Sequence, residues 1–121
     1  MPKLSQFTIN SDYPATAKTG SASANITMPA TSFAGGQSRV FTKDTTVASG
    51  AILMPIIQVG DNYYVGNGYS WRNDNWNEEV WIERLSDTSI RLVFYVVNTS
   101  ASTLTHPGNI ITLHLSTFKV P

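Results

Sequence analysis

One stretch of sequence decides the fold class of this chain: Ser89-Ile90-Arg91-Leu92-Val93-Phe94-Tyr95-Val96-Val97. A first apolar series recurs there at every second position and consists of Ile90, Leu92, Phe94 and Val96. This period of two is that of a β-strand, in which successive side chains point to opposite faces of a sheet. The intervening Val93, Tyr95 and Val97 line the second face, so we expect both faces of this strand to be covered.

Turn residues separate this strand from similar segments on either side. Ser86-Asp87-Thr88 lies between it and a second strand at Glu79–Leu85, which predicts a hairpin. Elsewhere Gly, Pro, Asn and Ser recur about every ten residues, a spacing typical of β-sandwiches and barrels. The segments between these turn residues are predicted strands: Gln6–Asn10, Ala22–Met28, Arg39–Thr42, Ala51–Val59, Asn62–Gly66 and Ile111–Leu115.

No segment has a helical period over a useful length. The sequence therefore predicts a single all-β domain over residues 1–121, an antiparallel β-sandwich of about six to eight strands with no substantial helix. Three segments are predicted to be loops because small, polar or glycine residues dominate them: 15–21, 30–38 and 66–77. Pro55 interrupts the apolar run at Ala51–Val59 and marks a bulge or an edge, since proline cannot donate to a ladder.

Composition excludes several classes of function. Charged residues make up 13% of the chain and the formal net charge is zero, so there is no basic surface for nucleic acid or an anionic membrane. The chain has no cysteine, which excludes disulfides, thiolate chemistry and Cys-ligated metals. Because small secreted domains often have disulfides, the absence of cysteine favours a cytosolic or viral origin. Met1–Ser5 lacks an apolar region, so we expect no secretory signal peptide.

The predicted loop 66–77 is chemically the richest part of the chain. Its candidate ligand-binding residues are Tyr69, Trp71, Arg72, Asn73, Asp74, Asn75 and Trp76. Aromatic rings stack on the C–H faces of sugars, while Asn, Asp and Arg bind the hydroxyl groups. The same mixture suits a protein–protein contact, where Trp, Tyr and Arg dominate. A third interpretation is that the aromatic residues fold back over the core.

The sequence gives little support for catalysis, and we expect no catalytic residues, no metal and no cofactor. His106 precedes the turn Pro107-Gly108 and is expected to be solvated, whereas His114 alternates with core residues on a strand. Glu79 and Glu83 share one face of a predicted strand and are the best candidates for a glycosidase pair. Flanked by Trp81 and Arg84, they fit solvated or ion-paired side chains better.

Four segments together resemble a known class of protein: 7–14, 25–29, 90–98 and 107–115. Their order is similar to that in the small β-sandwich domains at the tips of phage and prophage tail proteins, including the H-type-lectin-like kind. The resemblance implies a sandwich of six or seven strands, a homotrimer, and recognition of a bacterial surface glycan or another tail protein. It also implies a place in the virion, after synthesis in the bacterial cytoplasm.

Three functions follow as hypotheses. The first is a non-enzymatic, phage-tail-associated binding domain for a bacterial surface glycan. The second is a structural virion or tail-assembly protein that contacts other tail subunits. The third is a small polysaccharide hydrolase. For either of the first two, a homo-oligomer is expected, with a trimer favoured, because a neighbouring subunit would cover the second apolar face of the strand at Ser89–Val97. The alternative is that a second sheet of the same chain covers this face.

Overall fold

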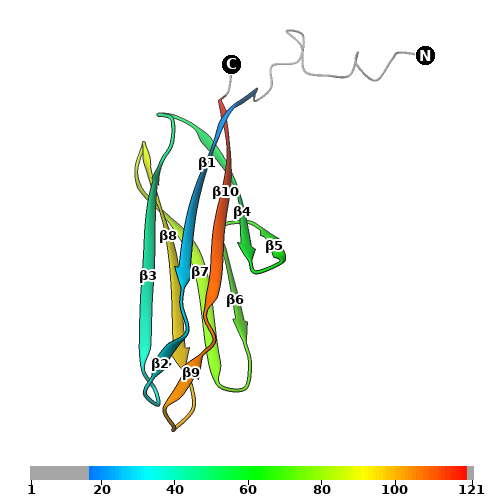
Figure 1. The fold of residues 1–121 in the computed structure, drawn as a ribbon. Helices are drawn as coiled ribbons and strands as arrows, with labels where there is room; N and C mark the ends of the chain where they lie inside the picture. The colour runs from blue at the N-terminus through cyan, green and yellow to red at the C-terminus, as the bar shows by residue number, and fades with distance from the viewer. Residues whose placement is uncertain (1–16, 120–121) are drawn as a thin grey trace, which may run out of the picture.

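The computed structural model describes residues 17–119 and places ten strands in three antiparallel sheets (Figure 1). No helix occurs among these residues, so the predicted all-β sandwich is confirmed. The strands are β1 (Ala17–Met28), β2 (Thr31–Phe33), β3 (Ser38–Thr46), β4 (Ile52–Val59), β5 (Asn62–Val65), β6 (Gly68–Arg72), β7 (Trp76–Ser86), β8 (Ser89–Asn98), β9 (Leu104–His106) and β10 (Asn109–Lys119).

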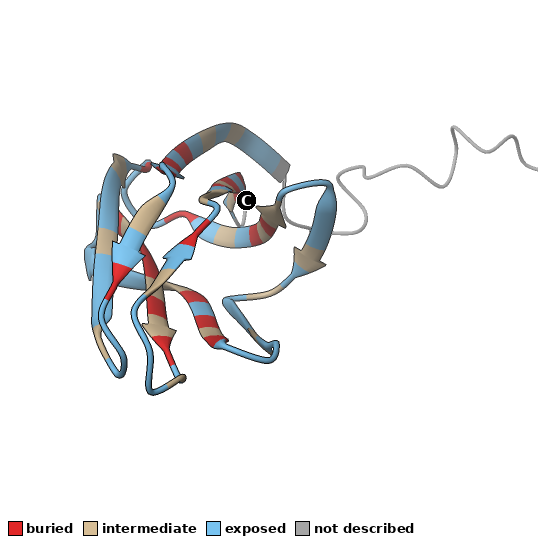
Figure 2. Cartoon of the chain, turned by 60° about the horizontal axis from the view of Figure 1, so that its bottom comes forward, coloured by how far each residue is buried: buried red, intermediate tan, exposed pale blue. Residues whose placement is uncertain are grey.

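Two four-stranded sheets form the layers of the sandwich. One has the order β1-β10-β4-β5 and the other β3-β8-β7-β6, while β2 and β9 form a short separate pair. Buried residues alternate with exposed ones along the long strands (Figure 2). The fully buried side chains that fill the space between the layers include Phe33, Ile57, Val80, Ile90, Leu92, Phe94, Val96, Ile111 and Leu113.

The strand that decides the fold class is the central β8. Ile90, Leu92, Phe94 and Val96 all point into the core with at most 1% of their surface exposed, as the period of two predicts. The opposite face is covered only in part, because Val93 is buried whereas Tyr95 and Val97 are half-buried. No second layer of this chain packs there among the described residues, so this side remains the outer face of the sheet.

Several predicted element boundaries are wrong. Residues 17–21 extend β1, and segment 30–38 contains β2 and the start of β3. Segment 66–77 is a hairpin of β6 and β7, with only residues 73–75 left as its turn. These additions, together with β9, raise the number of strands to ten. The predicted strand Gln6–Asn10 lies outside the described residues.

Of the two interpretations of Pro55, a bulge or an edge, the structure shows the edge. β5 pairs with β4 only from Ile56 to Val59, so β4 is an edge strand where Pro55 lies. On the other side Pro55 pairs in regular register with Leu115 of β10. A missing backbone donor is tolerated at such an edge because no neighbouring strand requires it.

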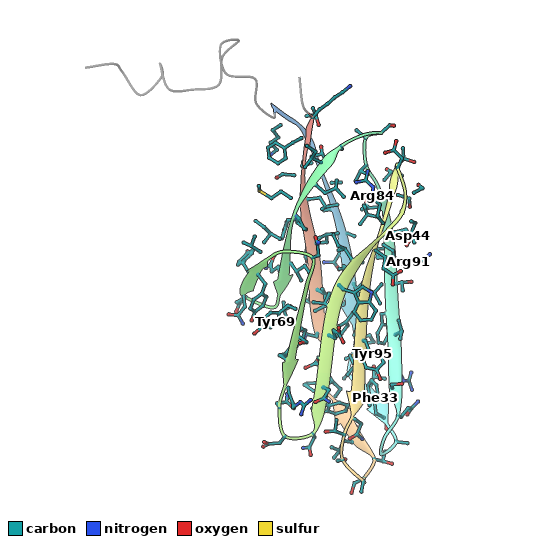
Figure 3. The ribbon with its side chains drawn as sticks, turned by 180° about the vertical axis from the view of Figure 1, so that it is seen from behind. Phe33, Asp44, Tyr69, Arg84, Arg91 and Tyr95 are labelled. Atoms are coloured by element: carbon teal, nitrogen blue, oxygen red, sulfur yellow. The ribbon has the colours of Figure 1, made fainter. Side chains whose placement is uncertain are left out.

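Two exposed aspartates predict how stability depends on acid. A hydrogen bond from Arg91 to Asp44, with Nε 2.8 Å from Oδ1, lowers the pKa of that carboxyl group (Figure 3). Hydrogen bonds from the Ser49 hydroxyl and the Gly50 amide lower the pKa of Asp87. A lowered native pKa means that the stabilisation is present above the ordinary value of 3.8 and is lost as the pH falls through the lower native value.

We therefore expect Asp44→Asn and Asp87→Asn to flatten the decline of stability in acid. Urea unfolding from pH 6 down to about pH 2 measures the slope. Asp61→Asn, in the exposed turn between β4 and β5, is the control for the removal of one exposed carboxyl group. Equal slopes for all three variants would contradict the prediction.

Candidate functional site

The predicted ligand-binding residues lie on the β6–β7 hairpin, which presents them to different faces. Arg72 pairs with Asn77 and Trp71 with Glu78 across the two strands. Since neighbouring side chains alternate between the faces of a sheet, Trp71 and Arg72 point in opposite directions. The hairpin therefore divides the predicted set into an inward group, an outward group and a turn.

The inward group begins with a row of stacked rings. Tyr64 and Tyr69 stack with centroids 3.7 Å apart, and Tyr69 and Trp71 follow at 5.8 Å. Trp71 then stacks on the core residue Phe94 at 6.2 Å. Tyr64 lies at the outer end of the row, and Tyr69, the second ring, is exposed (Figure 3). The row joins the edge of the molecule to its core, which is the packing role that the third interpretation assigns to these aromatic residues.

Trp76 is buried, with 8% of its surface exposed. Its ring meets Phe33 edge-on at 5.1 Å and His106 at 4.7 Å. The ring of Trp76 is thus enclosed by side chains of the same chain, as the third interpretation of these aromatic residues expects.

Below these rings lies a buried polar cluster that sequence reasoning missed. Glu78 and His106 are each 4% exposed, and His106 Nε2 is 2.9 Å from Glu78 Oε1. Trp71 Nε1 donates to Glu78 Oε2 at 2.6 Å. The prediction of a solvated His106 is therefore wrong. The residue lies on β9, whose placement over β7 depends on tertiary packing that the local Pro107-Gly108 motif does not reveal.

The hydrogen bonds of this cluster determine which ring nitrogen of His106 has the proton. The Gly108 amide donates to His106 Nδ1 at 2.9 Å, so Nδ1 is an acceptor and the imidazole proton lies on Nε2. His106 thus donates to Glu78, and both carboxylate oxygens accept from buried donors. With every hydrogen-bonding atom satisfied inside the protein, the cluster tethers β9 to the β6–β7 hairpin and presents no free group to a ligand.

The turn residues serve local structure. Asn73 Oδ1 accepts hydrogen bonds from the amides of Asn75 at 3.4 Å and Trp76 at 3.1 Å. The Thr99 amide donates to the Asn75 carbonyl oxygen at 2.8 Å, which holds the turn beside the end of β8. Asp74 is exposed at the tip.

The outward group leads to an open pocket on the outer face of the β3-β8-β7-β6 sheet. Its volume is about 460 Å³, and its lining residues are Ser70, Trp71, Arg72, Asn77, Glu78, Glu79, Tyr95 and Val97. Trp71 and Glu78 have side chains that point to the inner face. Arg72 is the one residue of the predicted set whose side chain shares the outer face with this pocket.

Strand register brings the polar groups of the pocket together. Glu79 lies between Ser70 on β6 and Tyr95 on β8, and Asn77 lies between Arg72 and Val97. Such cross-strand neighbours have Cβ atoms about 5 Å apart. None of the hydrogen bonds or ion pairs found within residues 17–119 uses the side chain of Arg72, Asn77 or Glu79. Three polar side chains beside a tyrosine ring are therefore available to a ligand.

Sequence reasoning named Arg72 but missed Asn77, Glu79 and Tyr95 as parts of one site. The signal was present in the period of two, which places Asn77 and Glu79 on one face of β7 and Tyr95 and Val97 on one face of β8. To place these residues in one site, the pairing register of the β6–β7 and β7–β8 hairpins must also be known. The assignment of residues 66–77 to a loop left the β6–β7 register out.

The two carboxylates considered as a glycosidase pair lie on one strand, on either side of a tryptophan. Glu79 and Glu83 lie four residues apart on β7, so their Cα atoms are separated by roughly 13 Å, with Trp81 between them. Trp81 Nε1 donates to Glu83 at 3.0 Å. Glu78 points to the inner face, away from Glu79.

Within residues 17–119 there is no group of three or more His, Asp or Glu side chains that could hold a metal ion. The same residues include no helix long and apolar enough to cross a membrane. Comparisons of the chain with family models, with curated proteins and with solved structures find no match.

Proposed function

We propose that this domain is a non-enzymatic binding domain that recognises a bacterial surface glycan through the outer-face pocket. The observation that supports the proposal is the grouping of Tyr95 with Arg72, Asn77 and Glu79 in one open hollow, where none of the latter three side chains bonds to another described residue. The predicted residues Trp71 and Trp76 are not needed for it, since their rings pack within the protein.

The chemistry of these groups matches that of a sugar ring. A tyrosine ring offers an apolar surface to the C–H groups of a pyranose. A carboxylate accepts hydrogen bonds from hydroxyl groups, a guanidinium group donates them, and the amide of Asn77 does both. Because the pocket is open and shallow, each site would bind weakly, and several copies on one particle would give useful avidity.

Variants of the pocket provide the test of this function. The wild-type protein is screened on an array of bacterial surface polysaccharides, and the strongest ligand is titrated by calorimetry. Arg72→Ala should weaken binding about tenfold or more, since a hydrogen bond to a charged group contributes about 1.5–3 kcal/mol. Tyr95→Ala should also weaken binding, because it removes the apolar ring surface for the sugar. Asp74→Ala is the matched control, exposed at the tip of the same hairpin but outside the pocket lining.

Two results would contradict the proposal. One is the absence of any polysaccharide ligand for the wild-type protein. The other is equal affinity for the wild type and both pocket variants, with circular dichroism showing that all of them are folded.

A place in a phage tail and a trimeric state remain predictions from the resemblance. Light scattering coupled to size-exclusion chromatography at low micromolar concentration measures the mass of the particle. A trimer of the 13.2 kDa chain is the expected result, and a monomer would count against the tail setting.

A further inference from the structure

The outer face of the second layer, β1-β10-β4-β5, has an exposed apolar surface. It is formed by outward side chains of β4 and β5 and by one from β10, which we call the β4–β5 patch: Ile52, Met54, Ile56, Tyr63, Val65 and Phe118. Met54 is 54% exposed and Val65 82%. Exposed apolar side chains gathered on one sheet face mark a surface that another segment or molecule covers.

The β4–β5 patch contains few polar groups. No Asp, Glu, Lys or Arg occurs at an outward position of β4 or β5, where the polar groups are the amide of Gln58 and the hydroxyl of Tyr63. Lys18 of β1 pairs with Phe118 and lies at one end of the patch. Gln58 Oε1 is already bonded to His114 Nε2 on β10 at 2.8 Å. An occupant of this surface is therefore expected to be apolar and uncharged.

The chain itself supplies such an occupant in the residues that precede β1. Gln6-Phe7-Thr8-Ile9-Asn10 alternates apolar and polar residues and has no charge, so as a strand it would present Phe7 and Ile9 on one face. Such an apolar segment matches the apolar β4–β5 patch better than the outer pocket of the opposite layer, which is polar and charged.

The chain also enters the fold at the correct end. β1 begins at Ala17, opposite Lys119, beside the row in which Lys18 pairs with Phe118 and Phe118 pairs with Ile52 (Figure 1). The patch thus starts next to the point where the preceding residues join the sheet.

The distances allow an intramolecular contact. From Ala17, Val65 lies three strands across, roughly 14 Å, and about five residues along the sheet, roughly 17 Å. The diagonal is therefore roughly 22 Å. The extended chain from Ile9 to Ala17 spans up to about 26 Å, so Ile9 can reach Val65 without displacing any described strand.

We propose that residues 6–10 dock across the β4–β5 patch of their own chain, with Phe7 and Ile9 packed against Met54 and Val65. The interaction buries the exposed apolar side chains of the β4–β5 patch and leaves the opposite outer face open for a ligand. It is independent of the identity of that ligand.

Engineered disulfides test the contact directly. The chain has no cysteine, so Ile9→Cys with Val65→Cys introduces the only thiol pair. The control pair is Ile9→Cys with Ser23→Cys, because Ser23 is exposed on the same face, level with Ile56 through His114. Ser23 is also about as far from Ala17, roughly 20 Å.

Docking predicts that the Val65 pair oxidises at least about tenfold faster than the Ser23 pair, as an intramolecular disulfide at low micromolar protein. Equal rates for the two pairs would overturn the proposal. Disulfide-linked dimers as the main product would also overturn it, since they would place the segment on a second copy.

Oxidation of Met54 gives a second measurement that needs no cross-link. In Phe7→Ser/Ile9→Ser, hydrogen peroxide should oxidise Met54 several-fold faster than in the wild type, as followed by peptide mass spectrometry. The control Thr8→Ala/Asn10→Ala changes the opposite face of the segment and should leave the rate unchanged. Met28, only 2% exposed, serves as the internal measure of folding. An unchanged Met54 rate in the first variant would overturn the proposal.

Discussion

Replacing Phe94 with alanine is expected to lower the free energy of unfolding by about 3–5 kcal/mol, the range for a buried Phe→Ala change. Phe94 is fully buried at the centre of β8. It packs against Phe41 of β3 and Trp71 of β6, each with its ring centroid 6.2 Å away. Its removal leaves a cavity where three strands of one sheet meet the opposite layer, and rigid strand pairing on both sides prevents the cavity from collapsing.

This loss is large compared with the whole stability of a domain of this size, about 5–15 kcal/mol. Equilibrium urea unfolding followed by tryptophan fluorescence measures it. Val40→Ala is the matched control: Val40 lies on the adjacent strand, opposite Tyr95, and is 56% exposed. Its cost should be about 1 kcal/mol or less. A similar small cost for Phe94→Ala would show that the predicted core is not formed.

Replacing Glu78 with glutamine is the second large expected effect, even though the two side chains have almost the same shape. Both partners of Glu78 are donors, Trp71 Nε1–H and His106 Nε2–H. The amide NH₂ group of glutamine must face one of these donors. His106 cannot offer Nε2 as an acceptor, because Nδ1 would then have the proton and face the Gly108 N–H.

A buried donor left without an acceptor costs about 1–3 kcal/mol, so Glu78→Gln should destabilise by that amount. Glu78→Ala leaves both donors without an acceptor and should lower the free energy of unfolding further. Glu79→Gln is the control, since Glu79 is exposed on the opposite face of the same strand and its replacement should change stability by about 0.5 kcal/mol or less. Urea unfolding at neutral pH measures the free energy of unfolding of the three variants. If Glu78→Gln were as stable as Glu79→Gln, the assigned hydrogen-bond directions would be wrong.

The β6–β7 hairpin shows why the candidate site could be predicted only in part. Its residues were recognised as the richest in polar and aromatic chemistry, and Arg72 does lie at the outer pocket. In β6, inward Tyr69 and Trp71 alternate with outward Ser70 and Arg72. Because the inward residues are aromatic and not aliphatic, this alternation was interpreted as the mixed composition of a loop. β-propensity is weak compared with pairing against a long neighbouring strand.

His106 illustrates the same limit for a single residue. The local motif His106-Pro107-Gly108 is that of an exposed turn, and nothing near it in sequence suggests a carboxylate partner. Glu78 is 28 residues away along the chain and reaches it only through the packing of β9 over β7.

The sequence by itself determined the all-β class, the strand β8 with its buried series and the β7–β8 hairpin, and it limited Pro55 to a bulge or an edge. These features are local: a period of two, turn residues and a missing backbone donor act within a few residues of where they occur. Only the tertiary structure decided which aromatic residues are buried, how Glu78 meets His106, and which polar groups share the outer pocket. Those contacts join residues far apart in the chain, and their geometry follows from strand register and layer packing, which depend on all the strands together.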